Sequence, residues 1–268
     1  MNYIQIAKES IRIAKERKYD FQGREVTLPN GDLENVIVIS PQMGERMLEE
    51  DLSPYYRNAA CEYFVWNSDS FQAARKLNAP LVMNFANAHV AGGGFLLGAT
   101  AQEEALCRCS TLYASIHSKH ASEMYRYNNA NLSPVESDYM LLSPEVYVFR
   151  DENCQLLEEP VRVGVITIPA PNRHGAAILA SSSVIRETMQ RRIRIMLRVA
   201  AKQGYKELVL GAWGCGAFGN NPKDVAGYFK RVLTEEEYGR CFEKVCFAIY
   251  GKEDGKNITA FRDAFEKN

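Results

Sequence analysis

The sequence contains no long apolar run; Leu208-Val209-Leu210 is typical of its longest purely apolar stretches. A transmembrane helix needs about 20 consecutive apolar residues, so none is expected. The first residues, Met1 to Gln5, also lack the basic segment and apolar stretch of a signal peptide. We therefore expect no membrane association.

Ordered cysteine and histidine spacings are missing as well. The seven cysteines are odd in number, include no Cys-x-x-Cys pair and show no regular spacing with the four histidines. A disulfide framework and a zinc site are both disfavoured by this pattern. We expect no metal, no cofactor and a reducing, cytoplasmic compartment.

Neither charge sign is in clear excess, because the sequence has 32 Lys and Arg and 33 Asp and Glu, a net charge of −1. Tight binding to nucleic acid normally needs a basic surface, so no sequence-specific nucleic-acid partner is expected. Internal repeats and Ser/Gly linkers are absent too. The economical organisation is a main domain over residues 36–268 with an N-terminal helical extension over residues 1–35.

Hydrophobic periodicity predicts the elements of the main domain. Short apolar, β-branched runs predict buried strands, and apolar residues at helical spacing predict a long helix near 183–203. Strands that alternate with helices indicate an α/β fold with a mixed, largely parallel central sheet. The polar stretch 118–138 is expected to be a surface loop. The predicted strands include 36–39, 81–85, 161–168 and 207–210.

Two of these strands end in glycine-rich loops that lead into helices, at residues 92–104 and 211–222. In a parallel sheet, ligands bind beyond the carboxyl ends of the strands. Glycines allow close approach of the backbone, and helix N-termini offer free N–H groups to phosphate oxygens. If both loops converge on one ligand, they are suited to a diphosphate.

Two adjacent carboxylates, Glu103 and Glu104, stand at the start of the helix after the first loop. Acidic residues are favoured in any first helical turn, and Thr100-x-x-Glu103 has the spacing of a capping box. The triple glycine immediately upstream favours a functional role for Glu104. We expect Glu103 to cap and position, and Glu104 to react.

Other residues of the two loops allow a structural interpretation. Phe95 and Phe218 can pack in the core, and Cys215 is more typical of a small buried thiol than of a nucleophile, since no histidine lies nearby in sequence. His89 and His174 are better explained as loop residues than as metal ligands. Gly214-x-Gly216-x-x-Gly219 nominally matches a dinucleotide fingerprint, but too little chain follows it for a Rossmann domain.

The spacing between the triple glycine and the acids is distinctive. Gly92-Gly93-Gly94 is followed, after residues 95–101, by Gln102-Glu103-Glu104. With this motif the chain resembles the bacterial-type poly(ADP-ribose) glycohydrolases, which have a macrodomain fold. Segments 82–88, 105–108, 169–172 and 211–219 are similar as well, so the resemblance spans roughly residues 36–265.

The resemblance implies a three-layer macrodomain-like fold and a glycosidase that hydrolyses the ribose–ribose O-glycosidic bonds of poly(ADP-ribose), releasing ADP-ribose. It implies that Glu104 is the general acid and base, and that Glu103 holds ribose hydroxyls. Its partners would be the polymer, ADP-ribose and ADP-ribosylated proteins. The substrate-binding residues it implies are Asn87, Gly92, Gly93, Gly94, Phe95, Gln102, Gly214, Cys215, Gly216, Ala217, Phe218 and Gly219.

Three other functions stay open at the level of sequence. A mono-ADP-ribosyl hydrolase would share the motif, and pocket shape would decide between the two hydrolases. A non-catalytic ADP-ribose reader would need the phosphate loops but not the adjacent acids. A nicotinamide-dependent oxidoreductase is the most remote of the three.

Overall fold

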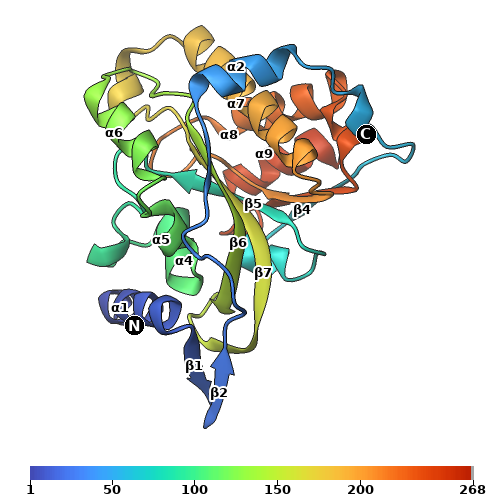
Figure 1. Cartoon of the computed structure of the whole chain (residues 1–268). Helices are drawn as coiled ribbons and strands as arrows, with labels where there is room; N and C mark the ends of the chain where they lie inside the picture. Colours follow the sequence, from blue (N-terminus) through green and yellow to red (C-terminus); the bar gives the residue numbers. More distant parts are fainter. Residues whose placement is uncertain (267–268) are drawn as a thin grey trace.

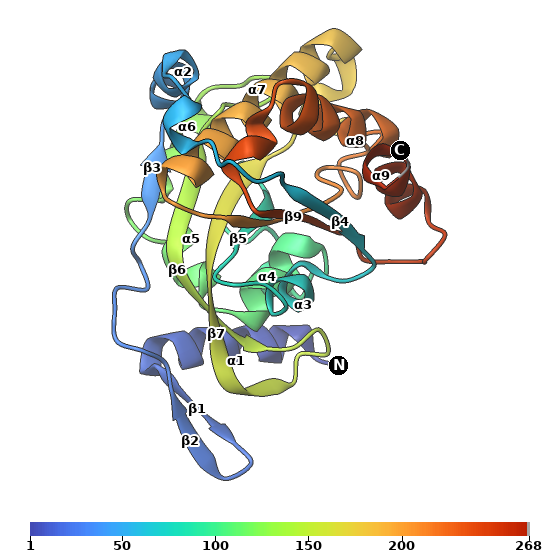
Figure 2. The same ribbon diagram turned by 90° about the vertical axis from the view of Figure 1, so that its right-hand side faces the viewer.

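The computed structural model describes residues 1–266, and a seven-stranded sheet forms its centre (Figures 1 and 2). The strand order is β3-β6-β7-β5-β8-β9-β4. The β3–β6 and β6–β7 pairs are antiparallel, and every pair from β7 across to β4 is parallel. This confirms the mixed, largely parallel sheet. The strands are β3 (Ile37–Ile39), β4 (Glu62–Trp66), β5 (Leu81–Ala86), β6 (Met140–Arg150), β7 (Leu156–Pro169), β8 (Glu207–Leu210) and β9 (Lys244–Ala248).

Helices cover both faces of the sheet and complete three layers, as Figure 2 shows in side view. One face carries α2 (Pro41–Glu49), α7 (Ser182–Lys202), α8 (Pro222–Lys230) and α9 (Lys256–Phe265). The opposite face carries α1 (Tyr3–Glu16), α3 (Ser70–Ala74), α4 (Gln102–Cys109), α5 (Leu112–Ile116) and α6 (Ser122–Ala130). Each layer buries its own apolar cluster against the sheet, because strands buried on both faces present apolar side chains to both sides.

Single-turn 3₁₀ segments and one π-turn join these elements. The 3₁₀ turns are Ser53–Tyr55, Phe95–Leu97, Ala176–Leu179 and Tyr238–Cys241, and the π-turn is Arg231–Glu235.

The first 35 residues hold the expected helix and also a hairpin that the sequence analysis did not anticipate. Strands β1 (Lys18–Phe21) and β2 (Arg24–Thr27) pair antiparallel around Gln22 and Gly23. Both turn residues have positive φ, 53° and 84°, as a tight hairpin turn of this kind requires. A small apolar cluster that includes Ile13 and Phe149 ties this segment to the base of the β6–β7 hairpin.

The expectation of a surface loop over residues 118–138 is wrong, because α6 occupies the middle of this stretch. The helix buries Met124, Tyr125 and Asn128, which lie on one face at helical spacing. One of the three is polar, so the stripe is too short and too mixed to stand out in the sequence.

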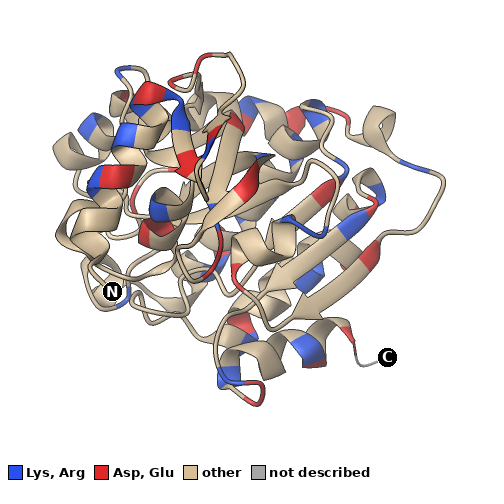
Figure 3. Cartoon of the chain, turned by 90° about the horizontal axis from the view of Figure 1, so that it is seen from below, with Lys and Arg blue, Asp and Glu red and all other residues tan. Residues whose placement is uncertain are grey.

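No helix in the described part of the chain is long and apolar enough to cross a membrane. On the face seen from below, Lys and Arg alternate with Asp and Glu over the same elements (Figure 3). This distribution agrees with the balanced composition.

Candidate active site

The two glycine-rich loops lie at the carboxyl ends of two neighbouring central strands. Strands β5 and β8 are parallel neighbours, with Leu81 paired to Leu208 and Val82 to Val209. Residues 87–101 connect β5 to α4, and residues 211–221 connect β8 to α8. Because parallel neighbours end on the same side, the loops lie together beyond their carboxyl ends, as expected.

The first loop binds the Glu104 carboxylate directly. Glu104 is 8% exposed, and its Oε1 accepts the backbone N–H of Gly94 at 2.9 Å. Its Oε2 is buried and has no hydrogen-bond partner among the described residues. A buried carboxylate oxygen is costly without a donor, which marks Glu104 as a candidate functional residue.

Gly93 has to be glycine for this arrangement. Its φ is +54°, and a Cβ at this position would lie 2.5 Å from Glu104 Oε1 and 3.4 Å from Glu103 Oε2. Both carboxylates therefore converge beneath one glycine. The N–H of Gly93 donates to Val90 O at 3.0 Å, while that of Gly94 serves Glu104. Both N–H groups therefore already have acceptors within the protein.

Glu103 does not cap its helix, so the predicted capping box is wrong. Helix α4 begins at Gln102 with Ala101 as an N-cap that makes no side-chain hydrogen bond. The Glu103 carboxylate points inward instead, where Oε2 accepts Asn87 N at 2.8 Å and Oε1 accepts Asn84 Nδ2 at 3.2 Å. The backbone N–H of Asn87, just after β5, thus takes the place that the capping box would give to Thr100 as the partner of Glu103.

The surroundings of Glu103 favour its protonated form. Burial raises the pKa of Glu103 to about 8, and the charge of Glu104 adds to this shift, whereas the hydrogen bonds from Asn87 and Asn84 oppose it. Glu103 is only 3% exposed. Glu103 therefore keeps its proton near neutral pH.

Gln102 fixes the start of α4 on β5. Its Oε1 accepts Phe85 N at 2.9 Å, and its Nε2 donates to Met83 O at 2.8 Å and to Ser70 Oγ at 3.0 Å. The Gln102 side chain therefore takes the place of a strand partner in the part of β5 that follows its pairing with β8. All of these hydrogen bonds are internal, which makes Gln102 a positioning residue.

Sequence reasoning missed Asn84, Ser70 and Thr167. Asn84 is fully buried in β5 and links Glu103 to Thr167 Oγ1 on the neighbouring strand, the latter at 3.1 Å. The available signal was one amide inside the apolar run of residues 81–85. Buried polar side chains need partners, and such an amide marks a hydrogen-bonded site.

Asn87 forms a turn at the entrance of the first loop. Its Oδ1 accepts the N–H groups of His89 at 2.8 Å and Val90 at 3.0 Å. This Asx-type turn leaves the amide nitrogen of Asn87 as the group available to a ligand.

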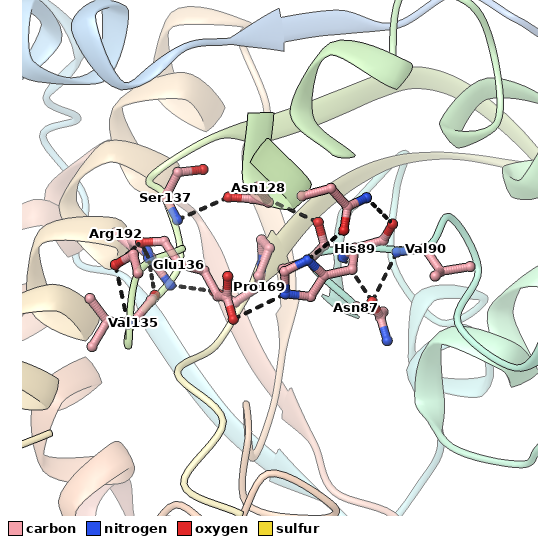
Figure 4. Close-up of polar contacts among 12 residues, drawn as sticks. Asn87, His89, Val90, Asn128, Val135, Glu136, Ser137, Pro169 and Arg192 are labelled. Atoms are coloured by element: carbon pink, nitrogen blue, oxygen red, sulfur yellow. Dashed lines mark hydrogen bonds and ion pairs between the residues drawn. The ribbon is translucent and has the colours of Figure 1, made fainter. Parts of the chain in front are cut away.

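The His89 ring supports the same turn from the other side (Figure 4). Its Nε2 lies 3.2 Å from the Glu136 carboxylate, and its Nδ1 lies 2.9 Å from Asn129 Oδ1. Glu136 is held in turn through its backbone carbonyl, which accepts from the fully buried Arg192 at 3.1 Å. His89 is thus a structural loop residue, in keeping with the sequence interpretation.

The second loop is braced by residues 169–174, which follow β7. Asn220 Nδ2 donates to Pro171 O at 2.8 Å, and His174 Nδ1 lies 2.9 Å from Ala217 O. Gly214 and Gly219 have positive φ, and a Cβ on Gly219 would lie 2.4 Å from the His174 ring. The loop is therefore preformed.

This loop also presents unused donors. Among the described residues, no hydrogen-bond acceptor faces the backbone N–H groups of Gly216, Ala217 and Phe218. Three successive free N–H groups make a concave anion site of the kind that binds phosphate oxygens. A Cβ on Gly216 would meet nothing within 4 Å, so the space beside it is open.

Two of the predicted substrate contacts lie in the core. Phe95 is 1% exposed and packs against Tyr113 with ring centroids 4.9 Å apart. Cys215 belongs to the apolar cluster on the α7–α8 face, and its N–H donates to Ala212 O at 3.0 Å. The structural interpretation holds for both side chains, because apolar groups beside a glycine turn fill the space under it.

A cavity of about 720 Å³ adjoins the second loop. It extends from Gly214 and Phe218 past Gln102 to the end of α4. A void of this size accommodates a nucleotide-sized ligand. No group of three or more His, Cys, Asp or Glu side chains suited to a metal ion occurs among the residues that the structure describes.

Comparisons with known proteins agree with this geometry. Residues 2–151 match the family described as microbial-type PARG, catalytic domain. No curated protein sequence gives a significant match.

Solved structures match over nearly the whole chain. A poly(ADP-ribose) glycohydrolase from Thermomonospora curvata is 34% identical, with a TM-score of 0.90 over 98% of this chain and 99% of that one. The same enzyme bound to the inhibitor ADP-HPD is 35% identical, with a TM-score of 0.88 over the same shares. The Deinococcus radiodurans enzyme in complex with ADP-ribose is 37% identical, with a TM-score of 0.81 over 90% of this chain and 98% of that one.

Proposed function

The chain belongs to the microbial-type poly(ADP-ribose) glycohydrolase family, and from this premise we propose that Glu104 is the general acid and base of its reaction. The protein is a glycosidase that hydrolyses the ribose–ribose O-glycosidic bond of poly(ADP-ribose) and releases ADP-ribose. The observation that carries the assignment is the Glu104 side chain, whose Oε1 is fixed by Gly94 while Oε2 is buried without a partner.

Glycoside hydrolysis needs a proton for the leaving oxygen and stabilisation of an oxocarbenium-like centre. Glu104 Oε2 gives its proton to the ribose oxygen as the glycosidic bond breaks. The resulting carboxylate then takes a proton from the attacking water, whose oxygen bonds to the anomeric carbon. This restores the acid and leaves a free hydroxyl on each product.

Glu103 holds a proton near neutral pH beside the reacting acid. Burial raises the pKa of Glu103 to about 8, so this carboxyl keeps a proton that an exposed carboxylate would have lost. Glu103 also anchors Asn87, and we assign the two residues to the ribose hydroxyls at the scissile bond.

The second loop takes the diphosphate, with the N–H groups of Gly216, Ala217 and Phe218 as donors. Phe218 lines the cavity and is available to pack on the distal ribose. This revises the sequence expectation for Gly93 and Gly94, since their N–H groups already have acceptors. Once held there, the diphosphate is a negative charge available to stabilise the oxocarbenium-like centre.

The N-terminal residues 1–35 serve as an extension that supports the helix carrying the acids. Ser10 Oγ donates to Arg108 O at 2.6 Å, and Tyr3 packs under the Arg108 guanidinium at 4.6 Å. We place the protein in the cytoplasm, acting on ADP-ribosylated proteins. The seven cysteines, all free thiols, support a reducing compartment.

The test compares the wild-type protein with Glu104→Gln on labelled poly(ADP-ribose) and on singly ADP-ribosylated protein. The amide keeps an oxygen for Gly94 N–H but has no acidic proton, so we expect hydrolysis to fall by roughly 10²–10⁴-fold while ADP-ribose affinity stays near wild type. Full hydrolysis by the variant contradicts the assignment. Release of label only from the singly modified protein would favour the mono-ADP-ribosyl hydrolase.

A further inference from the structure

Two cysteines from distant parts of the chain lie beside each other on the cavity wall. Cys109 ends α4, and Cys154 lies in the turn between β6 and β7. The carbonyl of Asp151 accepts both Cys109 Sγ at 3.4 Å and Cys154 N at 2.9 Å. Both side chains line the 720 Å³ cavity that adjoins the second glycine loop.

A buried cation without a carboxylate partner adjoins this pair. Arg108 is 2% exposed and forms no ion pair with any described residue. Its guanidinium contacts Ala99 O and the Tyr3 ring, and its Nε is buried without a hydrogen-bond partner. A buried charge of this kind is costly unless an opposite charge lies nearby, and a Cys154 thiolate supplies one.

Arg150 approaches Cys154 from the strand side. Its Nη1 donates to Cys154 O at 2.8 Å, and its Nη2 pairs with Glu9 at 2.6 Å. The hydrogen bond from Cys109, helped by the charges of Arg108 and Arg150, lowers the pKa of Cys154 to about 6, although burial opposes the shift. Cys109 shifts the other way, since that hydrogen bond and burial raise its pKa.

We propose that Cys154 and Cys109 are a peroxide-sensitive thiol pair that closes to a disulfide and thereby slows the enzyme. The Cys154 thiolate attacks one oxygen of a hydroperoxide, the O–O bond breaks, and Cys154 becomes a sulfenic acid as hydroxide or alkoxide leaves. Cys109 sulfur then attacks Cys154 sulfur and loses its proton. The S–O bond breaks, water leaves, and the two thiols have given two electrons to the peroxide.

The link to activity is helix α4. Its first turn carries Gln102, Glu103 and Glu104, and its last residue is Cys109. A covalent bond to the β6–β7 turn pulls on the C-terminal end of a helix whose N-terminal end must stay aligned with Gly94 to hold Glu104. This effect on rate rests on the proposed function of Glu104, whereas formation of the disulfide does not.

The first measurement is alkylation of the full-length wild-type protein with iodoacetamide at pH 7, followed by peptide mass spectrometry. Cys61 is the internal reference, because it is more exposed than Cys154 but burial raises its pKa to about 11. Since the thiolate is the reactive form, Cys154 should be labelled at least about tenfold faster than Cys61. Faster labelling of Cys61 would overturn the proposal.

The second measurement treats the protein with hydrogen peroxide and maps its peptides without reduction. We expect a Cys109–Cys154 cross-linked peptide and a lower hydrolysis rate, both reversed by dithiothreitol. Cys109→Ser should trap a sulfenic acid on Cys154 that reacts with dimedone, and Cys61→Ser should behave as wild type. Absence of the cross-linked peptide overturns the pair, and a cross-linked enzyme at full rate overturns its regulatory role.

Discussion

Gly94 donates its backbone N–H to Glu104 Oε1 at 2.9 Å, which fixes one carboxylate oxygen, while Oε2 has no hydrogen-bond partner among the described residues. Residues ten positions apart in the sequence thus form a single unit of loop and helix. The first loop thus holds the acid, and we propose that the second loop supplies the donors for the diphosphate. This division of roles between the loops determines how substitutions in each should behave.

Gly93→Ala should disable catalysis. The new Cβ would lie 2.5 Å from Glu104 Oε1 in a backbone conformation with φ +54°, so the carboxylate must move. A shift of about 1 Å in a catalytic group costs roughly 100-fold in rate, and we expect that loss in kcat on poly(ADP-ribose). Gly227→Ala is the matched control, because Gly227 lies in α8 with nothing within 4 Å of its Cβ position. Equal kcat values for the two variants would contradict the role of Gly93.

Gln102→Ala should loosen the start of α4 from β5. The change leaves Phe85 N and Met83 O without the partners they have at 2.9 Å and 2.8 Å. Unsatisfied buried groups cost about 1–3 kcal/mol each, so we expect a measurable loss of unfolding free energy in urea as well as a lower kcat. Gln72→Ala is the control, since that side chain makes only an exposed contact to Glu152 at 3.4 Å. A Gln102→Ala protein with wild-type stability and rate would show that the amide is dispensable.

The sequence predicted the parts of the site that are local in the chain. Glycines next to predicted strand ends indicate both loops, and the adjacent acids after the first loop indicate the buried carboxylates, without knowledge of the sheet order. Sequence reasoning missed Asn84, which contacts Glu103 directly, Thr167, which contacts Asn84 because β7 pairs with β5, and Ser70 of α3, which contacts Gln102. Tertiary packing brings these segments together, and local spacing does not encode it.

Two errors have the same physical origin. The capping box at Thr100 has suitable spacing, but the Glu103 carboxylate finds a better donor in Asn87 N once β5 is in place. Phe95 adjoins the glycines in sequence, yet its side chain is buried against Tyr113. In both cases a tertiary partner outcompetes the local one.

Gly214→Ala should weaken diphosphate binding. Its φ is +73°, and a Cβ would lie 2.6 Å from Asn220 Nδ2 and 2.8 Å from Ala170 Cβ, so the second loop must shift. Charge-assisted hydrogen bonds to the diphosphate contribute about 1.5–3 kcal/mol each, and losing one predicts at least about a tenfold rise in the ADP-ribose Kd. Isothermal titration should show a much smaller change for adenosine, which has no phosphate. A parallel loss for both ligands would place the diphosphate elsewhere.

The pH dependence of stability should reveal the buried carboxyl pair. An exposed glutamate has an ordinary pKa near 4.5, whereas burial raises the pKa of Glu103 to about 8 in the folded protein. Between these values the folded state binds more protons than the unfolded state, so the free energy of unfolding must fall as pH rises. The slope from this group reaches at most about 1.4 kcal/mol per pH unit and ends above pH 8.

Urea titrations from pH 5 to pH 9 should therefore show a decline in the free energy of unfolding. Glu103→Gln should flatten this decline, and Glu45→Gln, at an exposed position in α2, should leave it in place. If Glu103→Gln keeps the wild-type slope, Glu103 does not hold the extra proton, and another group must be the source of the slope.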